Sequence, residues 1–185
     1  MFRKFRLTDL YTDSGIRPIT ARMRRQLFDI LPDLQGSNVL DLFAGTGIVG
    51  LESMCRGAKH VAMVELNPRA CRAIQSVLKR NGIHAIIQPQ QLAESLHDIE
   101  ILCCDARKVE LNISYDIIFM DPPYDTGLLE PTLSHLHSLG VCKTSCTLVI
   151  RSSKREKQEC SWLILKREVQ HGDSVLRFYN PYSTD

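Results

Sequence analysis

The chain has 185 residues, of which 44% are hydrophobic and 24% are charged. This length predicts a single domain over residues 1–185, and the composition excludes a disordered chain, a collagen-like repeat and a coiled-coil rod. The N-terminus has no apolar signal segment, and no apolar run approaches the roughly eighteen residues of a membrane span. We therefore expect a soluble, cytoplasmic protein that has no membrane partner.

The formal net charge of +2 is unevenly distributed, because residues 1–25 alone carry +5. The basic residues in this segment are Arg3, Lys4, Arg6, Arg17, Arg22, Arg24 and Arg25. A basic N-terminal arm that runs into the first helix indicates a local anionic partner, although charge alone is equally compatible with a solvated arm that binds nothing.

Short apolar runs alternate with segments of helical periodicity, which is typical of βαβ units and a mostly parallel sheet. In chain order the predicted elements are a helix over Arg17–Leu31, a strand over Asn38–Phe43, a helix over Gly47–Arg56, a strand over His60–Glu65, a helix over Pro68–Asn81, strands over Ile101–Cys104 and Tyr115–Met120, a helix over Leu128–Leu139, and strands over Thr147–Arg151, Trp162–Arg167 and Val175–Tyr179.

The last two strands leave no room for a helix between them, so they predict an antiparallel hairpin around His171–Asp173. The segment Ile83–Gln91 reads as either a strand or a loop, and Leu92–Asp98 as a short helix. The basic stretch Arg151–Lys157 is interpreted as a solvated loop rather than a second phosphate contact.

The seven cysteines form no C-x-x-C pair and have no histidine partner at zinc spacing. They predict reduced thiols and no metal site, with Cys103 and Cys104 as core residues rather than nucleophiles.

A glycine-rich turn follows the first predicted strand, and Gly45 to Gly50 match the pattern G-x-G-x-x-G. Such a turn lets a ligand approach the backbone closely, and the ligand then lies at the start of a helix. Glu65 ends the second strand about twenty residues later, where an acid accepts hydrogen bonds from ribose hydroxyls. The pattern predicts an adenosine-type ligand but does not separate a dinucleotide from S-adenosylmethionine.

Asp41 favours S-adenosylmethionine. A carboxylate in the first strand attracts the methionyl ammonium, whereas it would repel a pyrophosphate. Asp105 follows the third predicted strand and is placed to accept from an adenine amino group, although such an aspartate often only caps a helix. The predicted cofactor-binding residues are Asp41, Phe43, Ala44, Gly45, Thr46, Gly47, Glu65, Leu66, Asp105 and Ala106.

The tetrad Asp121-Pro122-Pro123-Tyr124 follows the strand Tyr115–Met120. The prolines stiffen the turn and donate no hydrogen bond, so the Asp121 carboxylate and the Pro122 carbonyl can accept both hydrogens of an exocyclic amine while Tyr124 stacks on the base. Holding the hydrogens in this way concentrates the lone pair on nitrogen, and positioning supplies most of the catalysis. These four residues are the predicted catalytic set.

The chain resembles class I S-adenosylmethionine-dependent methyltransferases, and more narrowly the bacterial 16S rRNA (guanine-N2)-methyltransferases of the RsmD type. The resemblance rests on Arg17 to Thr20 with Arg22 and Leu27-Phe28, on Val39 to Glu52, and on Tyr115 to Tyr124, and it extends over nearly the whole chain. It implies a Rossmann-like, seven-stranded sheet with helices on both faces, and methylation of a guanine N2 in small-subunit rRNA.

The same resemblance assigns Asp41, Gly45 and Gly47 to the methionyl part, Glu65 to the ribose, Asp105 to the adenine and the tetrad to the target base. The seven basic residues of the arm are the candidate RNA contacts. The partner is then small-subunit rRNA, free or assembled in a 30S particle, bound by a monomer. Three alternatives stay open: an adenine-N6 methyltransferase acting on DNA or RNA, a nicotinamide-dependent oxidoreductase, and a non-catalytic RNA-binding module.

Overall fold

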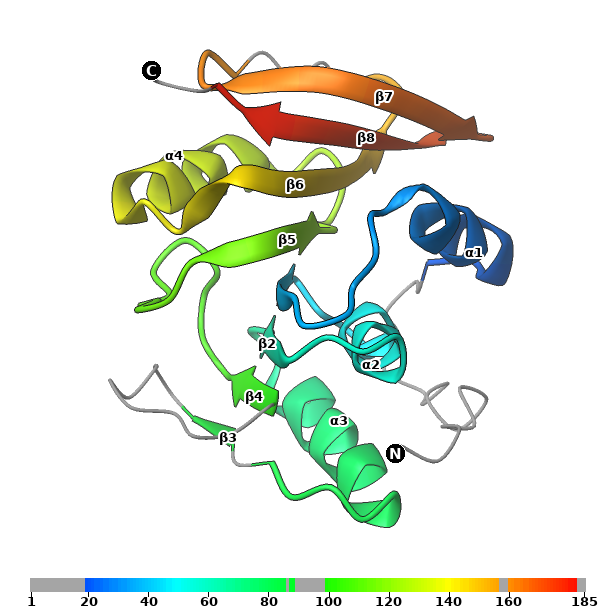
Figure 1. Cartoon of the computed structure of the whole chain (residues 1–185), viewed down its shortest axis with the longest axis vertical. Coiled ribbons are helices and arrows are strands. Elements are labelled where there is room, and N and C mark those ends of the chain that lie inside the picture. Colours follow the sequence, from blue (N-terminus) through cyan, green and yellow to red (C-terminus); the bar gives the residue numbers. More distant parts are fainter. Residues whose placement is uncertain (1–18, 86, 89–98, 157–159, 183–185) are drawn as a thin grey trace.

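A mixed β-sheet is the centre of the computed structural model, which describes residues 19–85, 87–88, 99–156 and 160–182 (Figure 1). Within these residues the sheet has eight strands in the order β3-β4-β2-β1-β5-β6-β8-β7. The strands are β1 (Asn38–Leu42), β2 (His60–Val64), β3 (Ile87–Gln88), β4 (Ile99–Leu102), β5 (Tyr115–Met120), β6 (Cys142–Ser153), β7 (Leu163–His171) and β8 (Ser174–Pro181). The helices are α1 (Ala21–Ile30), α2 (Ile48–Cys55), α3 (Pro68–Arg80) and α4 (Leu129–Leu139).

The predicted topology is confirmed. Strands β3, β4, β2, β1, β5 and β6 run parallel, and β8 and β7 add to this sheet in antiparallel orientation. The sheet has one strand more than the predicted seven, because Ile87 and Gln88 pair with β4 at its edge. The sequence leaves the segment Ile83–Gln91 open between a strand and a loop, and Ile87 and Gln88 of this segment form the short strand. The predicted helix over Leu92–Asp98 lies outside the described residues.

Two strand boundaries correct the prediction. Strand β4 begins at Ile99 and ends at Leu102, so Cys103 and Cys104 lie in the loop after it and are half-buried rather than core strand residues. Strand β6 continues to Ser153, and its last six residues are buried. The first half of the stretch read as a solvated loop is therefore a buried strand end.

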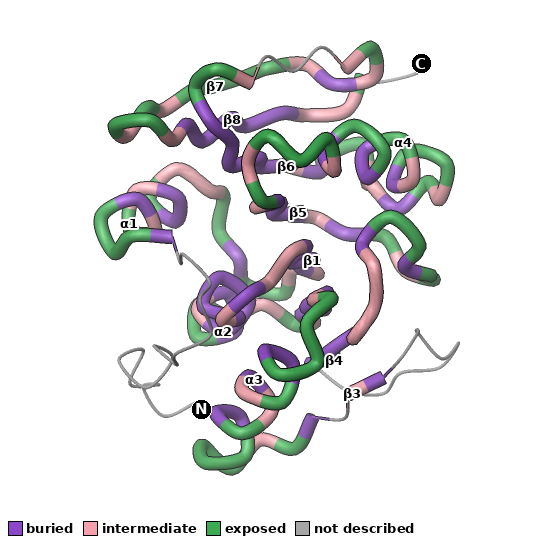
Figure 2. Tube along the Cα trace, turned by 180° about the vertical axis from the view of Figure 1, so that it is seen from behind, coloured by how far each residue is buried: buried purple, intermediate pink, exposed green. Residues whose placement is uncertain are grey.

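Helices cover both faces of the sheet, as predicted: α1, α2 and α3 lie on one face and α4 on the other (Figure 1). Alternate residues of each strand feed the two cores. Val39 and Ile117 pack beneath the first three helices, whereas Leu40 and Ile118 pack against α4. The tube in Figure 2 shows buried residues running along the central strands between these layers.

Local signals explain where the helices begin and end. The Asn67 side chain accepts a hydrogen bond from the Arg69 amide at 2.9 Å, and Pro68 takes the first position of α3, where no amide is needed. Thr20 caps α1 in the same way through the Met23 amide. Helix α4 ends at Gly140, whose φ of 62° is a conformation that glycine adopts without strain.

The strand order reverses between β1 and β5. From β1 the chain builds outward through β2 and β4, and it then returns to place β5 and β6 on the other side. Loops at the carboxyl ends of β1 and β5 therefore diverge and leave a crevice, where ligands of open α/β sheets bind. Among the described residues, no helix is long and apolar enough to cross a membrane.

Candidate functional site

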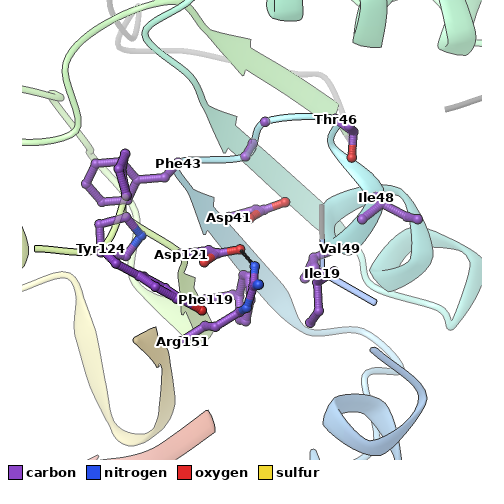
Figure 3. Close-up of a pocket in the computed structure, with 14 residues that line it drawn as sticks. Ile19, Asp41, Phe43, Thr46, Ile48, Val49, Phe119, Asp121, Tyr124 and Arg151 are labelled. Carbon is purple, nitrogen blue, oxygen red and sulfur yellow. Dashed lines mark hydrogen bonds and ion pairs between the residues drawn. The ribbon is translucent and has the colours of Figure 1, made fainter. Parts of the chain in front are cut away.

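Two adjoining cavities open at the carboxyl ends of the central strands. The first, of about 430 Å³, lies between the glycine-rich turn after β1 and the tetrad after β5 (Figure 3). It is lined by Ile19, Asp41, Phe43, Ala44, Gly45, Thr46, Ile48, Val49, Phe119, Asp121, Pro122, Pro123, Tyr124 and Arg151.

The second cavity, of about 330 Å³, extends from the same turn to the loops after β2 and β4. Its lining includes Glu65, Leu66, Asp105 and Ala106, which are predicted cofactor residues. The two cavities share Phe43, Gly45, Asp121 and Pro123. Apart from Gly47, which supports the turn, every predicted cofactor residue and the whole tetrad therefore line these two adjoining cavities, which together form the crevice.

The turn between β1 and α2 depends on its glycines. Gly45 and Gly47 have φ values of 57° and 72°, where a side chain would be strained, and a Cβ on Gly47 would lie 3.0 Å from the Ile74 side chain. Gly50 lies in α2 against β2, where a Cβ would come within 2.7 Å of Met63. The pattern G-x-G-x-x-G thus serves a tight turn and a close contact between helix and strand.

Glu65 ties this turn to the end of β2. One carboxylate oxygen accepts from the Gly45 amide at 2.8 Å, and the other accepts from the Asn67 amide at 2.8 Å. Each oxygen keeps a further acceptor position, because a carboxylate oxygen has two lone-pair sites. The side chain can therefore orient the loop and still receive a hydroxyl from a ligand in the second cavity.

Asp41 is a buried carboxyl group beneath the turn. Its side chain is 1% exposed and accepts from the Gly50 amide at 2.9 Å. Burial raises the pKa of Asp41 to about 8, although the Gly50 amide opposes this rise, and the nearby Asp121 and Glu65 add to it. A buried acid in this state favours a cationic ligand, which restores the charge balance when the carboxyl ionises.

Asp121 is placed by the parallel pairing of β1, β5 and β6. Its amide donates to the Leu42 carbonyl at 3.3 Å, and its carboxylate receives Arg151 Nη1 at 2.6 Å. Burial raises the pKa of Asp121 to about 6, and the charge and hydrogen bond of Arg151 limit this rise. The carboxylate is consequently ionised at neutral pH and available as an acceptor.

Tyr124 is fixed at its hydroxyl and at its ring. The hydroxyl lies 2.8 Å from Ser174 Oγ at the start of β8. The Arg151 guanidinium lies over the ring, with Cζ 5.6 Å from the ring centroid. In Figure 3 Asp121, Tyr124 and Arg151 converge on the same side of the cavity.

Asp105 lies in the second cavity, as the adenine assignment requires, but it already has a cationic partner. Arg107 binds its carboxylate through Nε and Nη2, the latter at 2.6 Å, and this hydrogen bonding lowers the pKa of Asp105. The Arg107 amide also donates to the carboxylate at 2.9 Å. The side chain is thus both a cap of its own loop and a wall of the cavity.

The predicted RNA-binding residues fall into three groups. Arg3, Lys4, Arg6 and Arg17 lie outside the described residues. Arg22 and Arg25 are exposed on α1.

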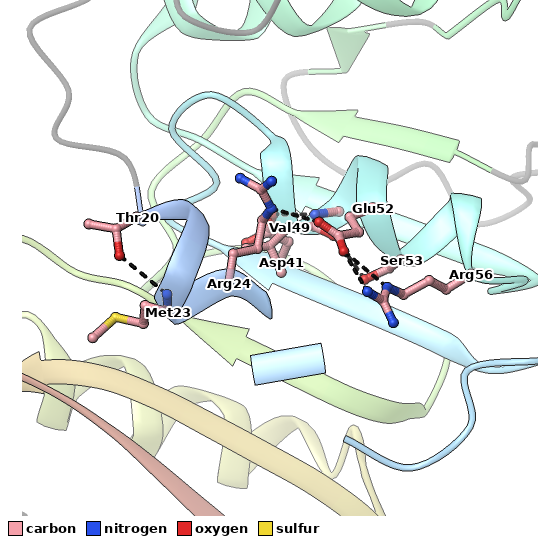
Figure 4. Close-up of polar contacts among 9 residues, drawn as sticks. Thr20, Met23, Arg24, Asp41, Val49, Glu52, Ser53 and Arg56 are labelled. Atoms are coloured by element: carbon pink, nitrogen blue, oxygen red, sulfur yellow. Dashed lines mark hydrogen bonds and ion pairs between the residues drawn. The ribbon is translucent and has the colours of Figure 1, made fainter. Parts of the chain in front are cut away.

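Arg24, the third described member of the basic arm, is half-buried. It donates from Nε to Glu52 of α2 at 2.6 Å (Figure 4). Glu52 also pairs with Arg56 at 2.8 Å, and the Arg56 guanidinium lies 4.5 Å from the Phe28 ring centroid. These contacts attach α1 to the helix that carries the glycine turn, so Arg24 has a structural partner.

Sequence reasoning missed Arg151. The prediction included it in the strand Thr147–Arg151, which is confirmed, but also began a solvated loop with it, which is wrong, because it is 6% exposed and pairs with the tetrad aspartate. One signal was available: Arg151 directly follows the apolar run Thr147–Ile150, at the carboxyl end of a strand, where the tetrad also begins. Ser174 was missed as well, because no local pattern connects it to the site, and Ile19 belongs to the block Arg17 to Thr20 but was not among the predicted site residues.

The described residues contain no group of three or more His, Cys, Asp or Glu side chains that could hold a metal ion.

Comparisons with known proteins agree with this architecture. The family model described as conserved hypothetical protein 95 matches residues 3–180. The chain is 30% identical over 178 residues to ribosomal RNA small subunit methyltransferase D of Escherichia coli strain K12. This alignment covers 89% of this chain and 79% of that relative. The chain is 27% identical over 158 residues to the protein of the same name from Buchnera aphidicola subsp. Acyrthosiphon pisum, covering 84% and 78% of the two chains.

Among solved structures, the putative methyltransferase yhhF from Escherichia coli superposes with a TM-score of 0.76 at 25% identity, over 92% of this chain and 90% of that one. The sheet order, the crevice at the strand reversal and the family match over residues 3–180 are mutually consistent. The chain therefore belongs to the conserved hypothetical protein 95 family, the RsmD family, and has the Rossmann-like fold of class I methyltransferases.

Proposed function

We propose that this chain transfers the methyl group of S-adenosylmethionine to the exocyclic N2 amine of a guanine in small-subunit ribosomal RNA. The observation that carries the proposal is that the glycine turn and the tetrad bound one cavity of about 430 Å³. A methyl donor held by the turn and an amine held by Asp121 would meet there without an intervening protein nucleophile.

The charges of the crevice fit the sulfonium cofactor better than a dinucleotide. Asp41, Glu65, Asp105 and Asp121 contribute carboxyl groups to its walls, and the two arginines of the walls, Arg107 and Arg151, are each paired with one of them. Such a lining attracts an ammonium and a sulfonium and opposes a pyrophosphate. This supports S-adenosylmethionine over the nicotinamide alternative.

The division of the crevice suggests which residues would hold each part of the cofactor. Asp41 and the turn Gly45–Gly47 would hold the methionyl end. Glu65 would accept from the ribose, while Asp105 and Ala106 would border the adenine in the second cavity. When bound, the cofactor supplies an electrophilic methyl group on a positively charged sulfur.

The tetrad supplies the other half of the reaction. Asp121 is ionised at neutral pH and accepts one amine hydrogen, and the Pro122 carbonyl is the second acceptor. Tyr124 offers a ring for the base to stack upon. An aromatic amine is a weak nucleophile, because its lone pair is delocalised into the ring; two acceptors that hold its hydrogens localise that pair on nitrogen. Asp121 can then take the proton that the methylated amine releases.

The proposal of ribosomal RNA as substrate is supported by the printed names of the relatives and by the position of α1. Ile19, directly before this helix, lines the first cavity, and Arg22 and Arg25 are exposed on the helix beside it. Basic side chains next to the pocket would neutralise phosphates of a bound RNA. The guanine N2 atom is proposed from the resemblance, since the tetrad suits an amine on either purine.

The test is methyl transfer from labelled S-adenosylmethionine to undermethylated 30S particles and, in parallel, to naked small-subunit rRNA. Mass spectrometry of the digested RNA identifies the product. N2-methylguanosine supports the proposal, whereas N6-methyladenosine overturns the base assignment. Absence of transfer to either RNA, by a protein that binds the cofactor in calorimetry, would show that the substrate is wrong. Asp121→Asn serves as the inactive control and Asp116→Asn as its matched partner on the same strand.

A further inference from the structure

Arg151 is a buried cation at the edge of the first cavity that the predicted mechanism does not use. Strands β5 and β6 pair in parallel with Met120 opposite Ile150, so the next residue of each strand, Asp121 and Arg151, lie side by side. The Arg151 side chain is only 7% exposed, and the Asp121 side chain is 18% exposed. A cation in such a position must be balanced by a partner, because burying an unpaired charge is costly.

Two of the groups assigned to the target base depend on this arginine. Its Nη1 donates to Asp121 Oδ2 at 2.6 Å, which leaves Oδ1 for an amine hydrogen. Its guanidinium also lies over the Tyr124 ring, with Cζ 5.6 Å from the ring centroid, and so restrains the ring on which a base would stack. Ser174 holds the Tyr124 hydroxyl at 2.8 Å from the other side, so the ring cannot swing away freely.

We propose that Arg151 is the positioning residue of the target-base site: it orients the Asp121 carboxylate and holds the Tyr124 ring for stacking. The inference rests on the proposed function and deepens it. Arg151 does not touch the reacting atoms. It acts through Asp121 and Tyr124, and its planar fork suits both tasks, since a guanidinium binds a carboxylate and stacks on a ring at once.

The charges around Asp121 give this role a measurable signature. The carboxylate faces Arg151 from β6 and lies close enough to Asp41 of β1 for the two acids to repel. Arg151 stabilises the ionised form of Asp121, while burial opposes it. Removing the arginine therefore raises the pKa of Asp121 further, so the carboxyl stays protonated over a wider pH range, where it is a weaker acceptor and cannot take up the proton of the amine.

The experiment compares Arg151→Gln, Arg151→Lys and the control Lys143→Gln. Lys143 pairs with Asp116 at 2.7 Å and joins the same two strands at their opposite end. We expect Arg151→Gln to lower kcat by about 10–100-fold, as for a preorganised group removed from a site. The acid limb of its pH–rate profile should move up by about one pH unit or more. Arg151→Lys should restore most of the pH profile but less of kcat, because it keeps the charge and loses the planar fork.

A second measurement does not need activity. NMR titration of the protein labelled with ¹³C in its aspartate carboxyl groups, with the Asp121 resonance assigned by Asp121→Asn, follows the pKa of Asp121 directly. The Asp121 resonance should titrate at higher pH in Arg151→Gln and be unchanged in Lys143→Gln. Calorimetry should show unaltered S-adenosylmethionine affinity in all three variants.

The outcomes separate this inference from the proposed function. If the wild-type protein methylates no RNA, the proposed function fails, while the NMR titration still reports on Arg151. If the wild type is active and Arg151→Gln keeps the kcat, the acid limb and the Asp121 titration of the wild type, Arg151 is not a positioning residue. Should Arg151→Gln fail to fold, Arg151→Lys tests the role through kcat: a reduced kcat with unchanged cofactor affinity supports it, and a wild-type kcat overturns it.

Discussion

Two ion pairs join the same two strands, β5 and β6, at opposite ends, and their environments differ. Asp121 meets Arg151 at 2.6 Å at the carboxyl end, and Asp116 meets Lys143 at 2.7 Å at the amino end. The Arg151 and Asp121 side chains are 7% and 18% exposed, against 38% for Lys143 and 29% for Asp116. The bond lengths are therefore nearly equal while the exposure to water is not.

The two aspartates respond in opposite directions. Burial raises the pKa of Asp121 to about 6 despite Arg151. At Asp116 burial is again the largest single influence and raises the pKa, but the hydrogen bonds from Lys143 and the Asn38 amide and the charge of Lys143 together outweigh it, so the pKa of that carboxyl is lowered. The comparison shows that loss of water, rather than the ion pair itself, makes the carboxyl-end aspartate suited to chemistry. Asp121 also lines both cavities, whereas Asp116 lines neither.

The largest expected effect tests whether the two aspartates differ in function. Asp121→Asn should lower the methyl transfer rate by about 10²–10³-fold, because it removes a charged acceptor aimed at the reacting amine. Asp116→Asn should leave the rate within about twofold, since surface substitutions away from the site change little. Single-turnover transfer to undermethylated 30S particles measures both. Equal losses in the two variants would mean that the site is misplaced.

A smaller effect is expected on the free energy of unfolding when the cation of either ion pair is removed. Arg151→Gln leaves the Asp121 carboxylate buried without its partner, which should lower the free energy of unfolding by about 3 kcal/mol at pH 7. Lys143→Gln breaks a partly exposed pair and should cost no more than about 1 kcal/mol. Urea denaturation at pH 7 gives both values. The comparison fails if Lys143→Gln proves as destabilising as Arg151→Gln.

Asp41 is buried more deeply than either paired aspartate. Burial raises the pKa of Asp41 to about 8, so the free protein holds this carboxyl protonated at pH 7. A cation bound beside it favours the ionised form, and binding then releases a proton. S-adenosylmethionine affinity should accordingly rise with pH, by up to about tenfold per unit between pH 6 and 8, and level off above pH 8.

Calorimetry in two buffers of different ionisation enthalpy detects the proton that is released. Asp41→Asn should abolish both the pH dependence and the proton release. A wild-type affinity that is constant over this range would show that Asp41 does not meet the cationic end of the cofactor.

The smallest expected effect concerns the support of Tyr124 from β8. Ser174→Ala removes the hydroxyl partner of Tyr124, a hydrogen bond that contributes about 1 kcal/mol. KM for the RNA should rise by about fivefold, while cofactor affinity stays unchanged. Ser138→Ala is the control, because this exposed serine of α4 donates to the His135 carbonyl outside both cavities. A similar rise in KM in both variants would remove the specific role of Ser174.

Local patterns in the sequence predicted most of the fold. The helix α3 was foreseen to within one residue because Asn67 and Pro68 start it and its apolar residues follow one face. The order of apolar strands and helical segments predicted the parallel sheet and the closing hairpin. The pattern over Ile83–Gln91 left a strand and a loop open, since the short edge strand Ile87–Gln88 depends on its pairing with β4.

The residues of the candidate site also differ in whether a local sequence pattern predicts them. The glycine turn and the tetrad are contiguous in the chain and carry their own chemistry, so both were visible in the sequence. Arg151 is different, because it was judged by its basic neighbours in a stretch that reads as a loop. Its burial depends on how far β6 continues beside β5 and β8, which its own composition does not reveal.

The amino-acid sequence was sufficient for the class of fold, the glycine turn, the tetrad and the edge of the sheet at which they meet. Those features follow from residues that are near neighbours in the chain, where periodicity and backbone preference act directly. The pairing of Asp121 with Arg151 and of Tyr124 with Ser174 joins residues 30 and 50 positions apart. Only strand order and register bring such residues together, because those are decided by the packing of the whole sheet rather than by any local stretch.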